Sequence, residues 1–407
     1  MNLCITPTRL SGSLTVPSSK SMSHRLVIAA ALASGESRIT NLSLSEDITA
    51  TLNAVKVQGA RWQLAGDTAV ICRQDTPVNL PLLDCGESGS TLRFLIPVAL
   101  ALTGGASFTG RGRLMERPLT PYFQIFGEKG ISWEQNEHVL TFKGTLKPGC
   151  YEIDGGVSSQ FITGLLLALP LLDGDSEIRA TGQLESRPYL DMTLSALEAF
   201  GIQVKASADC CRFEVPGGQQ YRAASLAVEG DYSQAAFFLT ANFIGASVCL
   251  QGLSPRSSQG DRVAGEILSG FAQPEEVTVD CSQIPDLVPA LAVAAAFRPG
   301  SCTRFVRAGR LRIKESDRIA TTAAMLRALG GQVAEEPEGL TVWGQEKLCG
   351  NAAPVDCAND HRIAMAAAAA SVGCENPVTL LGAACVKKSY PRFWKDFQML
   401  GGQLKKV

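Results

Sequence analysis

The chain reads Ser18-Ser19-Lys20-Ser21-Met22-Ser23-His24-Arg25 immediately before an apolar stretch, Leu26 to Leu32, where a buried helix is expected. Lys20 and Arg25 therefore stand at a helix N-terminus, where unpaired N–H groups already carry partial positive charge. Cations are unfavourable there unless an anion joins them. Hydroxyls, free N–H groups and a Lys/Arg pair at one point predict a phosphate or carboxylate site. The alternative is a serine-capped helix with two solvated cations.

Further polar segments of this kind precede other apolar, nearly charge-free runs. They are Gly86 to Arg93, Gly155 to Gln160, Glu229 to Ser233, Ile284 to Asp286 and Asn359 to Arg362. Each run is followed by a Gly, a short β-rich segment and an amphipathic helix, such as Tyr189 to Phe200 or Asp317 to Leu329. The pattern predicts six βαβ-type units, about 55 to 75 residues apart, with six buried helices packed in parallel.

Length and charge narrow the class of protein. A chain of 407 residues exceeds the size at which single cores stop growing, so two domains are expected. A formal net charge of −2 argues against a nucleic-acid-binding protein, so any anion site must be a focused cluster. No apolar run is long enough to span a membrane, and Met1 to Pro17 does not read as a signal peptide. We expect a cytoplasmic enzyme without membrane attachment.

Cysteine and histidine usage predicts neither a disulfide framework nor a metal site. The thirteen cysteines are scattered without a C-x-x-C pair and are expected to be buried thiols in a reducing compartment. The three histidines, His24, His138 and His361, do not cluster. Walker A and dinucleotide-binding motifs are absent as well, so we expect no metal and no cofactor.

Three basic segments occupy loops. Arg111 to Pro118 follows a predicted strand, Arg310 to Arg318 precedes the second helix of the fifth unit, and Val386 to Pro391 takes the matching place in the sixth. A dense run such as that around Lys314 is, on its own, more often a solvated surface. Recurrence of basic loops at equivalent repeat positions favours a shared anion site.

Five segments together resemble the 5-enolpyruvylshikimate-3-phosphate synthase family, in the family's order and over essentially the whole chain. They are Ser19 to Arg25, Ser158 to Phe161, Ser186 to Tyr189, Ile313 to Arg318 and Asn359 to Arg362. The resemblance implies a transferase of the shikimate pathway, which leads to chorismate and the aromatic amino acids. Such an enzyme moves the enolpyruvyl group of phosphoenolpyruvate to the 5-hydroxyl of shikimate 3-phosphate. It releases phosphate through a tetrahedral ketal intermediate, without metal or organic cofactor.

The resemblance also implies a fold. This is the α/β, two-domain enolpyruvyl transferase fold, an inside-out α/β barrel in which each domain has three βαβαββ units around buried parallel helices. Residues 19–229 are expected to form one domain with the shikimate 3-phosphate site. Residues 1–18 plus 230–407 are expected to form the other, with much of the phosphoenolpyruvate site. The active site is expected in the cleft between them, in a monomer.

Site residues follow from the same resemblance. Those expected to bind shikimate 3-phosphate are Lys20, Ser21, Arg25, Ser158, Ser159, Gln160, Ser186, Tyr189, Asp286 and Lys314. Those expected to bind phosphoenolpyruvate are Lys20, Gly89, Arg117, Gln160, Arg318, Arg362 and Lys388. The expected catalytic residues are Lys20, Asp286, Lys314 and Glu315. The reaction needs an acid and a base beside one carbon–carbon unit, and which residue moves which proton stays open.

Inhibition by glyphosate, in competition with phosphoenolpyruvate, is also implied by the resemblance, and Gly89 places the chain with the sensitive members. Three residues depart from the family pattern. Glu87 and Arg310 stand where many members carry Asn, and Phe94 stands where many carry Pro, which could shift the helix that carries Gly89.

Three alternatives to this family remain. The UDP-N-acetylglucosamine enolpyruvyl transferases have a Lys-Asn pair in place of Lys20-Ser21 and usually a loop Cys near the position of Arg117, which this chain lacks. RNA 3′-terminal phosphate cyclases would require a nucleotide site, a catalytic His and a broader basic surface. A non-enzymatic repeat scaffold would not need convergent cations in six loops.

Overall fold

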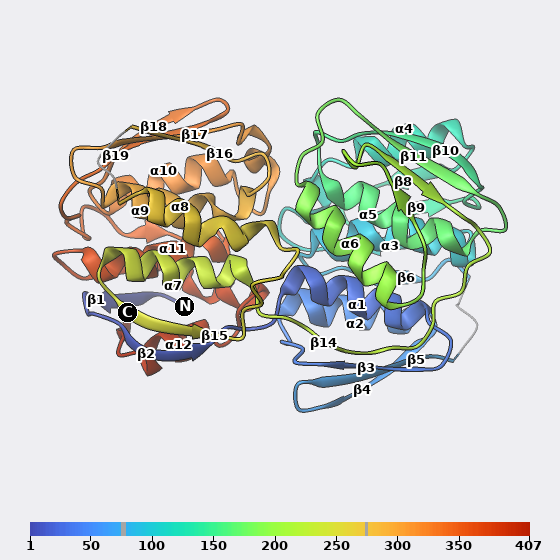
Figure 1. Ribbon diagram of the computed structural model, residues 1–407, viewed down its shortest axis with the longest axis horizontal. Coiled ribbons are helices and arrows are strands. Elements are labelled where there is room, and N and C mark those ends of the chain that lie inside the picture. The colour runs from blue at the N-terminus through green and yellow to red at the C-terminus, as the bar shows by residue number, and fades with distance from the viewer. Residues whose placement is uncertain (75–78, 273–275) are drawn as a thin grey trace. The chain divides into compact units, whose positions relative to one another are not determined.

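The structure is a computed structural model that describes residues 1–74, 79–272 and 276–407. The chain divides into two compact units; in Figure 1 one runs from blue to green, and the other combines the blue chain start with the yellow-green to red part. Ser18–Glu229 forms what we call the central unit, and Met1–Pro17 together with Gly230–Val407 forms the terminal unit. The chain therefore passes between the units twice, at Pro17–Ser18 and at Glu229–Gly230.

The central unit contains three repeats, each with a buried helix, a strand, an outer helix and a strand pair. The first comprises α1 (Lys20–Leu32), β3 (Glu36–Thr40), α2 (Glu46–Val57), β4 (Ala60–Ala65) and β5 (Thr68–Arg73). The second comprises β6 (Leu82–Asp84), α3 (Gly89–Thr103), β7 (Gly105–Thr109), α4 (Thr120–Glu128), β8 (Ser132–Gln135) and β9 (Val139–Lys143). The third comprises β10 (Gly149–Asp154), α5 (Ser159–Ala168), β11 (Ser176–Thr181), α6 (Arg187–Ala199), β12 (Lys205–Ala206) and β13 (Arg212–Val215), and β14 (Ser225–Ala227) follows it.

The terminal unit repeats this order, with the chain start completing it. Its strands from the chain start are β1 (Leu3–Thr6) and β2 (Ser11–Thr15). The fourth repeat has α7 (Tyr232–Ile244), β15 (Ser247–Gln251) and α8 (Ala264–Gly270). The fifth has β16 (Val277–Asp280), α9 (Val288–Ala296), β17 (Cys302–Val306), α10 (Arg318–Ala328), β18 (Gln332–Glu336) and β19 (Gly339–Trp343). The sixth has β20 (Val355–Asp356), α11 (His361–Ala370), β21 (Val378–Leu381), α12 (Phe393–Met399) and β22 (Gln403–Lys406).

Five of the sheets share one strand order, a parallel pair followed by two antiparallel strands. In the second repeat this order is β6-β7-β9-β8, and Phe108 of β7 lies opposite Leu83 of β6 and Leu140 of β9. In the sixth repeat β1 completes the sheet, because Leu3 pairs with both Leu380 of β21 and Lys406 of β22. The repeated βαβαββ order predicted for the chain is thus present.

The fourth repeat differs from the expected pattern. Within the described residues its sheet consists of the parallel pair β15 and β2 alone.

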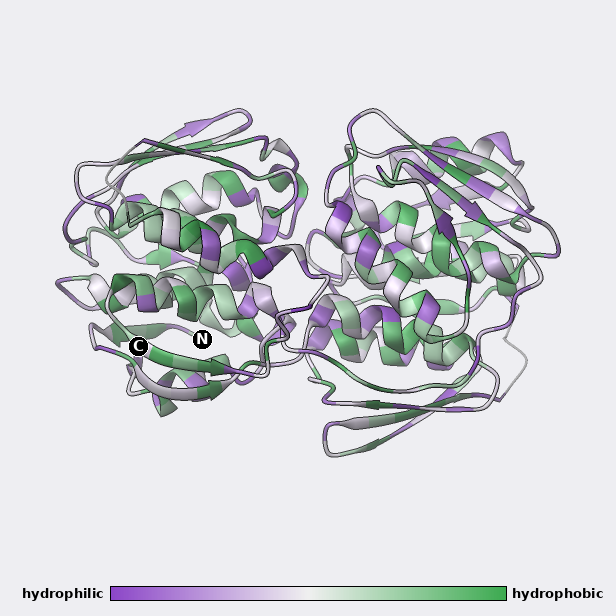
Figure 2. Cartoon of the chain, viewed as in Figure 1, coloured by the Kyte–Doolittle hydropathy of each residue, from purple (hydrophilic) through white to green (hydrophobic). Residues whose placement is uncertain are grey.

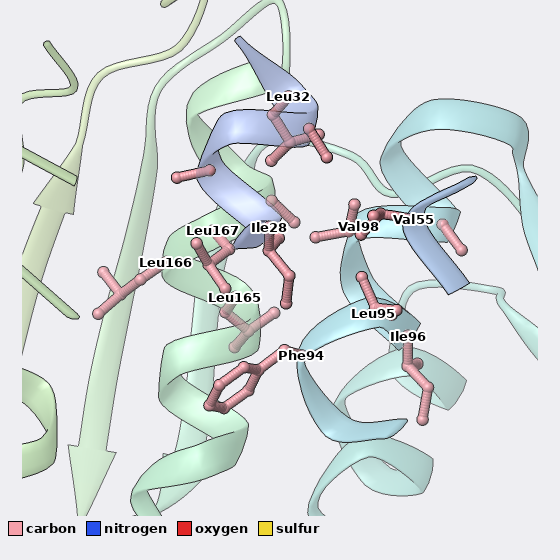
Figure 3. Close-up of a cluster of buried hydrophobic side chains, with 14 of the residues drawn as sticks. Ile28, Leu32, Val55, Phe94, Leu95, Ile96, Val98, Leu165, Leu166 and Leu167 are labelled. Carbon is pink, nitrogen blue, oxygen red and sulfur yellow. The ribbon is translucent and has the colours of Figure 1, made fainter. Parts of the chain in front are cut away.

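The helices of each unit lie inside and the sheets lie outside, as Figure 1 shows for each unit separately. The inner helices are apolar all round, and every residue of α9 and α11 is buried. Figure 2 shows this hydropathy along the chain. In the central unit, Ile28 of α1, Val98 of α3 and Leu165 of α5 belong to one core cluster, together with Val55 of the outer helix α2 (Figure 3).

The N-termini of most inner helices are capped by polar side chains, as the sequence predicts. Ser19, Ser88 and Ser158 accept a hydrogen bond from the backbone N–H of Met22, Thr91 and Gln160 respectively. Asp231 and Asp360 cap α7 and α11 in the same way. Within the described residues, no helix is both long and apolar enough to span a membrane.

All thirteen cysteines are free thiols, but the prediction that they are buried is wrong in part. Cys150 and Cys249 are exposed, and six of the others are buried. The two exposed thiols lie on strands β10 and β15, where alternate side chains face solvent.

Candidate active site

Lys20 lies in the first turn of α1 and is paired with a carboxylate of the neighbouring helix. Its Nζ donates to Oδ2 of Asp47 at 2.8 Å, and the two side chains are 16% and 9% exposed. Asp47 lies in the first turn of α2, where a negative charge is stabilised by the helix dipole. The sequence assigned no role to Asp47, because it stands outside the motif segments.

Arg25 is buried, so the alternative of two solvated cations at this helix start is wrong. Its Nε donates to Thr193 Oγ1 at 2.8 Å, and its Nη1 donates to the carbonyl oxygen of Ser21 at 2.6 Å. Its Nη2 donates to the carbonyl oxygen of Tyr189 and to Thr163 Oγ1. Burial lowers the pKa of Arg25 to about 10. Nη1 carries two N–H groups, and the carbonyl oxygen of Ser21 is its one acceptor among the described residues.

Gln160, in the first turn of α5, forms hydrogen bonds with two residues of α3. Its Oε1 accepts from Arg93 Nη1 at 2.7 Å, and its Nε2 donates to Ser90 Oγ at 3.0 Å. Arg93 Nη2 also donates to the carbonyl oxygen of Pro118. Arg93 thus joins Gln160 to the loop that carries Arg117. The sequence analysis included Arg93 in the Gly86 to Arg93 segment but assigned it no site role.

Gly89 and Arg117 are in close contact. A Cβ added to Gly89 would lie 2.8 Å from Arg117 Nη1 and 3.0 Å from its Cζ. The guanidinium of Arg117 therefore lies against the first turn of α3, and the absence of a side chain at Gly89 makes room for it. These two predicted phosphoenolpyruvate residues are brought together within the central unit.

Ser186 precedes α6 in an unusual backbone conformation. Its φ is +56°, in the left-handed region that residues other than glycine rarely adopt. Ser186 is buried, and its side chain makes no helix-capping hydrogen bond with the described residues. Strain of this kind concentrates at functional sites. Ser158 and Ser159 start α5, and Ser159 is buried.

Arg318 is the centre of the cluster in the terminal unit. Its side chain, 1% exposed, contacts the three carboxylates of Asp360, Asp286 and Glu315 at 2.9, 2.9 and 2.6 Å. These anions raise the pKa of Arg318 despite its burial. Asp360 caps α11 while it accepts from Arg318, so it orients both elements. The sequence analysis quoted Asp360 within a motif but assigned it no role.

Asp286 lies between two guanidinium groups. Its Oδ1 accepts from Arg318 Nη1 at 2.9 Å and its Oδ2 accepts from Arg362 Nη2 at 2.8 Å. Burial alone would raise the pKa of Asp286, but Arg362, Lys314 and Arg318 hold it well below its usual range. Asp286 is therefore an anion in this state, and it is a weak proton acceptor.

The pKa of Lys314 is shifted towards neutrality, unlike the pKa values of Asp286 and Arg318 beside it. Burial, assisted by the charges of Arg310 and Arg318, lowers its pKa to about 7, although Asp286 and Glu315 act in the opposite direction. An amine with this pKa exchanges protons readily at neutral pH. Perturbed pKa values of this size are typical of functional sites.

Lys388 is buried at the end of the short helix η7 (Ala383–Lys388) and donates to the carbonyl oxygen of Asn359 at 2.7 Å. Ala358 and Asn359 both have positive φ, so the loop before α11 is strained where it meets Lys388. The terminal unit therefore gathers all of its predicted residues around the starts of α9, α10 and α11: Asp286, Lys314, Glu315, Arg318, Arg362 and Lys388.

The three departures from the family pattern have defined surroundings. Glu87 lies beside Gly112, where an added Cβ would be 2.7 Å from its Oε2. Arg310 donates to the carbonyl oxygen of Ser282 at 2.6 Å. Phe94 is fully buried beneath the Arg25 guanidinium, 5.1 Å from its ring centre. Within the described part of the chain, no group of three His, Cys, Asp or Glu side chains is arranged as a metal site.

Comparison with known proteins places the chain in a family. The sequence profile of EPSP synthase (3-phosphoshikimate 1-carboxyvinyltransferase) matches residues 5–397. The chain belongs to the EPSP synthase family. It has 3-phosphoshikimate 1-carboxyvinyltransferase activity, and it is a transferase of the shikimate pathway that uses phosphoenolpyruvate and shikimate 3-phosphate.

Individual relatives agree with this EPSP synthase membership. The chain is 42% identical to the 3-phosphoshikimate 1-carboxyvinyltransferase of Clostridium beijerinckii, with 98% of each chain covered. It is 44% identical to that of Clostridium kluyveri, with 98% of this chain and 97% of the relative covered. A solved structure of EPSP synthase from Acinetobacter baumannii is 25% identical and superposes with a TM-score of 0.79, covering 100% of both chains. The predicted family, fold class and activity are confirmed.

Proposed function

We propose that the chain carries out its transferase reaction with the residues described above, as a cytoplasmic monomer. The observation that carries this assignment is the cluster around Arg318, where Asp286 and Glu315 are hydrogen-bonded to one buried guanidinium and Lys314 has a pKa of about 7. This cluster supplies anions, cations and a group that titrates near neutrality, which are the parts that acid–base catalysis on anionic substrates requires.

Shikimate 3-phosphate is proposed to bind mainly to the central unit. Its phosphate would be held by the hydroxyls of Ser158, Ser159 and Ser186, and the capped start of α5 supports this because helix N-termini bind phosphate. The ring would lie against Gln160 and Tyr189.

The carboxylate side of shikimate 3-phosphate is proposed to contact Lys20, Ser21 and Arg25. The remaining Nη1 N–H of Arg25 supports this role. The other donors of Arg25 hold the α1, α5 and α6 segments in place around the ring.

Phosphoenolpyruvate is proposed to bind Lys20, Gly89, Arg117 and Gln160 of the central unit and Arg318, Arg362 and Lys388 of the terminal unit. In the ligand-free protein Asp286 forms ion pairs with both Arg318 and Arg362. An arriving substrate anion would compete with Asp286 for these guanidinium groups. Asp286 would then be released to accept a hydrogen bond from a ring hydroxyl of shikimate 3-phosphate.

For the proton transfers we propose that Lys314 takes the proton of the attacking 5-hydroxyl, because its pKa of about 7 leaves a neutral amine available at neutral pH. Glu315, a carboxylate paired with Arg318 in the ligand-free protein, would take up a proton from solvent when phosphoenolpyruvate displaces it from Arg318. It would then protonate C3 of phosphoenolpyruvate as the hydroxyl oxygen bonds to C2, which gives the tetrahedral ketal phosphate. In the second step Glu315 would take back a proton from C3 while the C2–O bond to phosphate breaks. Lys314 would return its proton to the leaving phosphate, so both residues regain their starting states.

The test is phosphate release with purified protein. Shikimate 3-phosphate with phosphoenolpyruvate should support turnover, and UDP-N-acetylglucosamine should not replace shikimate 3-phosphate. Glu315→Gln should lower kcat by about 10²-fold or more with little change in substrate binding. Lys20→Met should impair phosphoenolpyruvate use. Glu346→Gln, an exposed carboxylate of the same unit, is the matched control. Near-normal turnover of Glu315→Gln would exclude it from proton transfer.

A further inference from the structure

A chain of buried polar side chains crosses the central unit where the surrounding helices are apolar. His24 of α1, Thr51 of α2 and Thr91 of α3 are each 0% exposed, and Ser88, which caps α3, is 1% exposed. His24 Nδ1 lies 2.7 Å from Thr51 Oγ1, Thr51 Oγ1 lies 2.7 Å from Thr91 Oγ1, and Thr91 Oγ1 lies 2.7 Å from Ser88 Oγ. Three helices are thus joined by consecutive short hydrogen bonds.

This hydrogen-bond chain begins one helical turn away from Lys20. His24 lies one helical turn after Lys20 on α1, and Thr51 lies one turn after Asp47 on α2. The ion pair between Lys20 and Asp47, 2.8 Å long, and the hydrogen bond between His24 and Thr51 are therefore successive links between the same two helices. The further contact of Thr51 with Thr91 extends this connection to the helix that begins at Gly89.

In this series of hydrogen bonds, each donor points the same way, from His24 towards Ser88. Thr91 donates its single hydroxyl proton to Ser88, so Thr51 is the donor to Thr91 at 2.7 Å. The carbonyl oxygen of Asp47, 3.2 Å from Thr51 Oγ1, is a second and longer acceptor for the same proton. Thr51 then has no proton left for His24, and His24 Nδ1 must be the donor to Thr51.

The other ring nitrogen of His24 agrees with this direction. Nε2 is buried and has no hydrogen-bond partner among the described residues. A bare lone pair there costs less than an orphaned buried N–H group, which is rare in proteins. Burial, together with the charges of Lys20 and Arg25, lowers the pKa of His24 well below its usual value, so the ring is neutral.

The same volume could be filled by apolar side chains without the cost of burying four polar groups. Such networks rigidify and specify one arrangement of the elements that they join. Here the joined elements carry two residues that the proposed function assigns to one ligand, Lys20 in the first turn of α1 and Gly89 in the first turn of α3.

We propose that His24, Thr51 and Thr91 are positioning residues for phosphoenolpyruvate, because their hydrogen-bond chain fixes the first turn of α3 relative to the first turn of α1. This inference rests on the proposed function, in which Lys20 and Gly89 contact phosphoenolpyruvate. The serines proposed to hold shikimate 3-phosphate lie at the start of α5 and before α6. They are not part of this hydrogen-bond chain. In the proposed function Lys20 contacts both substrates, whereas Gly89 contacts phosphoenolpyruvate alone. A shift of α3 relative to α1 should therefore affect phosphoenolpyruvate more than shikimate 3-phosphate.

The test compares Thr51→Val, which keeps the side-chain shape but removes the hydroxyl, with Thr51→Ser, which keeps the hydroxyl. Thr51→Val should raise the KM for phosphoenolpyruvate by about 10-fold, corresponding to the loss of about one buried hydrogen bond. Its KM for shikimate 3-phosphate and its kcat should change less than about twofold. Thr51→Ser should resemble the wild type. Thr240→Val, which removes a buried hydroxyl from α7 in the terminal unit, controls for a general loss of packing or hydrogen bonding.

Two further measurements keep the inference falsifiable if Thr51→Val folds poorly. Thr91→Val and Thr91→Ser should show the same contrast. Nitrogen NMR of the wild type, which has only three histidines, should show a neutral His24 ring with the proton on Nδ1 at pH 7. A proton on Nε2, or equal increases in both KM values with either valine variant, would overturn the proposal. An inactive wild type would instead contradict the proposed function.

Discussion

At the scale of single residues, the site depends on how buried charges are compensated. Arg318 is nearly inaccessible but stays charged, because three carboxylates contact it. Lys314 has a carboxylate on each side, but the nearby guanidinium groups and the loss of solvent outweigh them. The same cluster therefore contains a permanent cation and a lysine that titrates near pH 7. This contrast is what allows one residue to bind and the other to transfer protons.

The titration of Lys314 can be measured without turnover. Lys314 is charged below its pKa of about 7 and neutral above it, so its reductive methylation should reach half of its maximal rate near pH 7. Asp286→Asn removes an anion that favours the charged form, so the midpoint should move to lower pH. Mass spectrometry of the labelled peptides gives both values, with the exposed Lys387 as reference for the reagent. A midpoint near the ordinary lysine value of about 10.4 would contradict the proposed role of Lys314 as a base.

At the scale of elements, most of the predicted site residues lie at or beside the starts of helices. In α1, α3 and α5 the cap side chain accepts from one backbone N–H, and the first four N–H groups of a helix have no partner within the helix. In α3 the cap at Ser88 is followed by Gly89, and the Arg117 guanidinium from the loop after β7 lies against that glycine. A Cβ at this position would therefore narrow the space in which phosphoenolpyruvate is proposed to bind.

Gly89→Ala should narrow this proposed binding space. The new Cβ would lie 2.8 Å from Arg117 Nη1, so the guanidinium must move. We expect the inhibition constant of glyphosate to rise by a larger factor than the KM for phosphoenolpyruvate, because glyphosate is the longer molecule. Steady-state kinetics with both compounds measure the two factors. Gly265→Ala is the control, since a Cβ there meets nothing within 4 Å. Equal factors would show that Gly89 does not set the length of the binding space.

At the scale of the whole molecule, the two units are joined by two adjacent chain crossings. On one side Ser19 N donates to the carbonyl oxygen of Glu229 at 2.7 Å, and on the other Asp231 N donates to that of Pro17 at 2.9 Å. These two hydrogen bonds hold the chain segments on either side of the crossings next to each other. The terminal unit also concentrates cations, because Lys314, Arg318 and Arg362 all act on Asp286, although the net charge of the chain is −2.

We therefore expect shikimate 3-phosphate to draw the two units together. The anion offsets repulsion between the cations proposed to bind it, so the bound protein should be more compact. Small-angle scattering should show a smaller radius of gyration at saturating ligand. Shikimate, which lacks the phosphate, should have a weaker effect at equal concentration. An unchanged radius with saturating shikimate 3-phosphate would rule out ligand-driven closure.

The sequence by itself determined the repeats, the inner helices and their capped starts. These features are local, because an apolar run of helical length and a capping residue a few positions away depend on neighbouring residues. The motif residues could be found for the same reason. Lys20, Gln160 and Arg318 lie within or beside a helix start that the pattern marks.

Only the tertiary structure decided which groups compensate these charges. Asp47 is 27 residues from its partner Lys20, and Thr193 is 168 residues from Arg25. The insertion of β1 between β21 and β22, and the two-stranded sheet of the fourth repeat, are also long-range outcomes. Ion pairing, burial and pKa depend on what the packing brings next to a side chain. A sequence pattern shows where a helix begins, but the partner of its first turn is set by the other helices that pack against it.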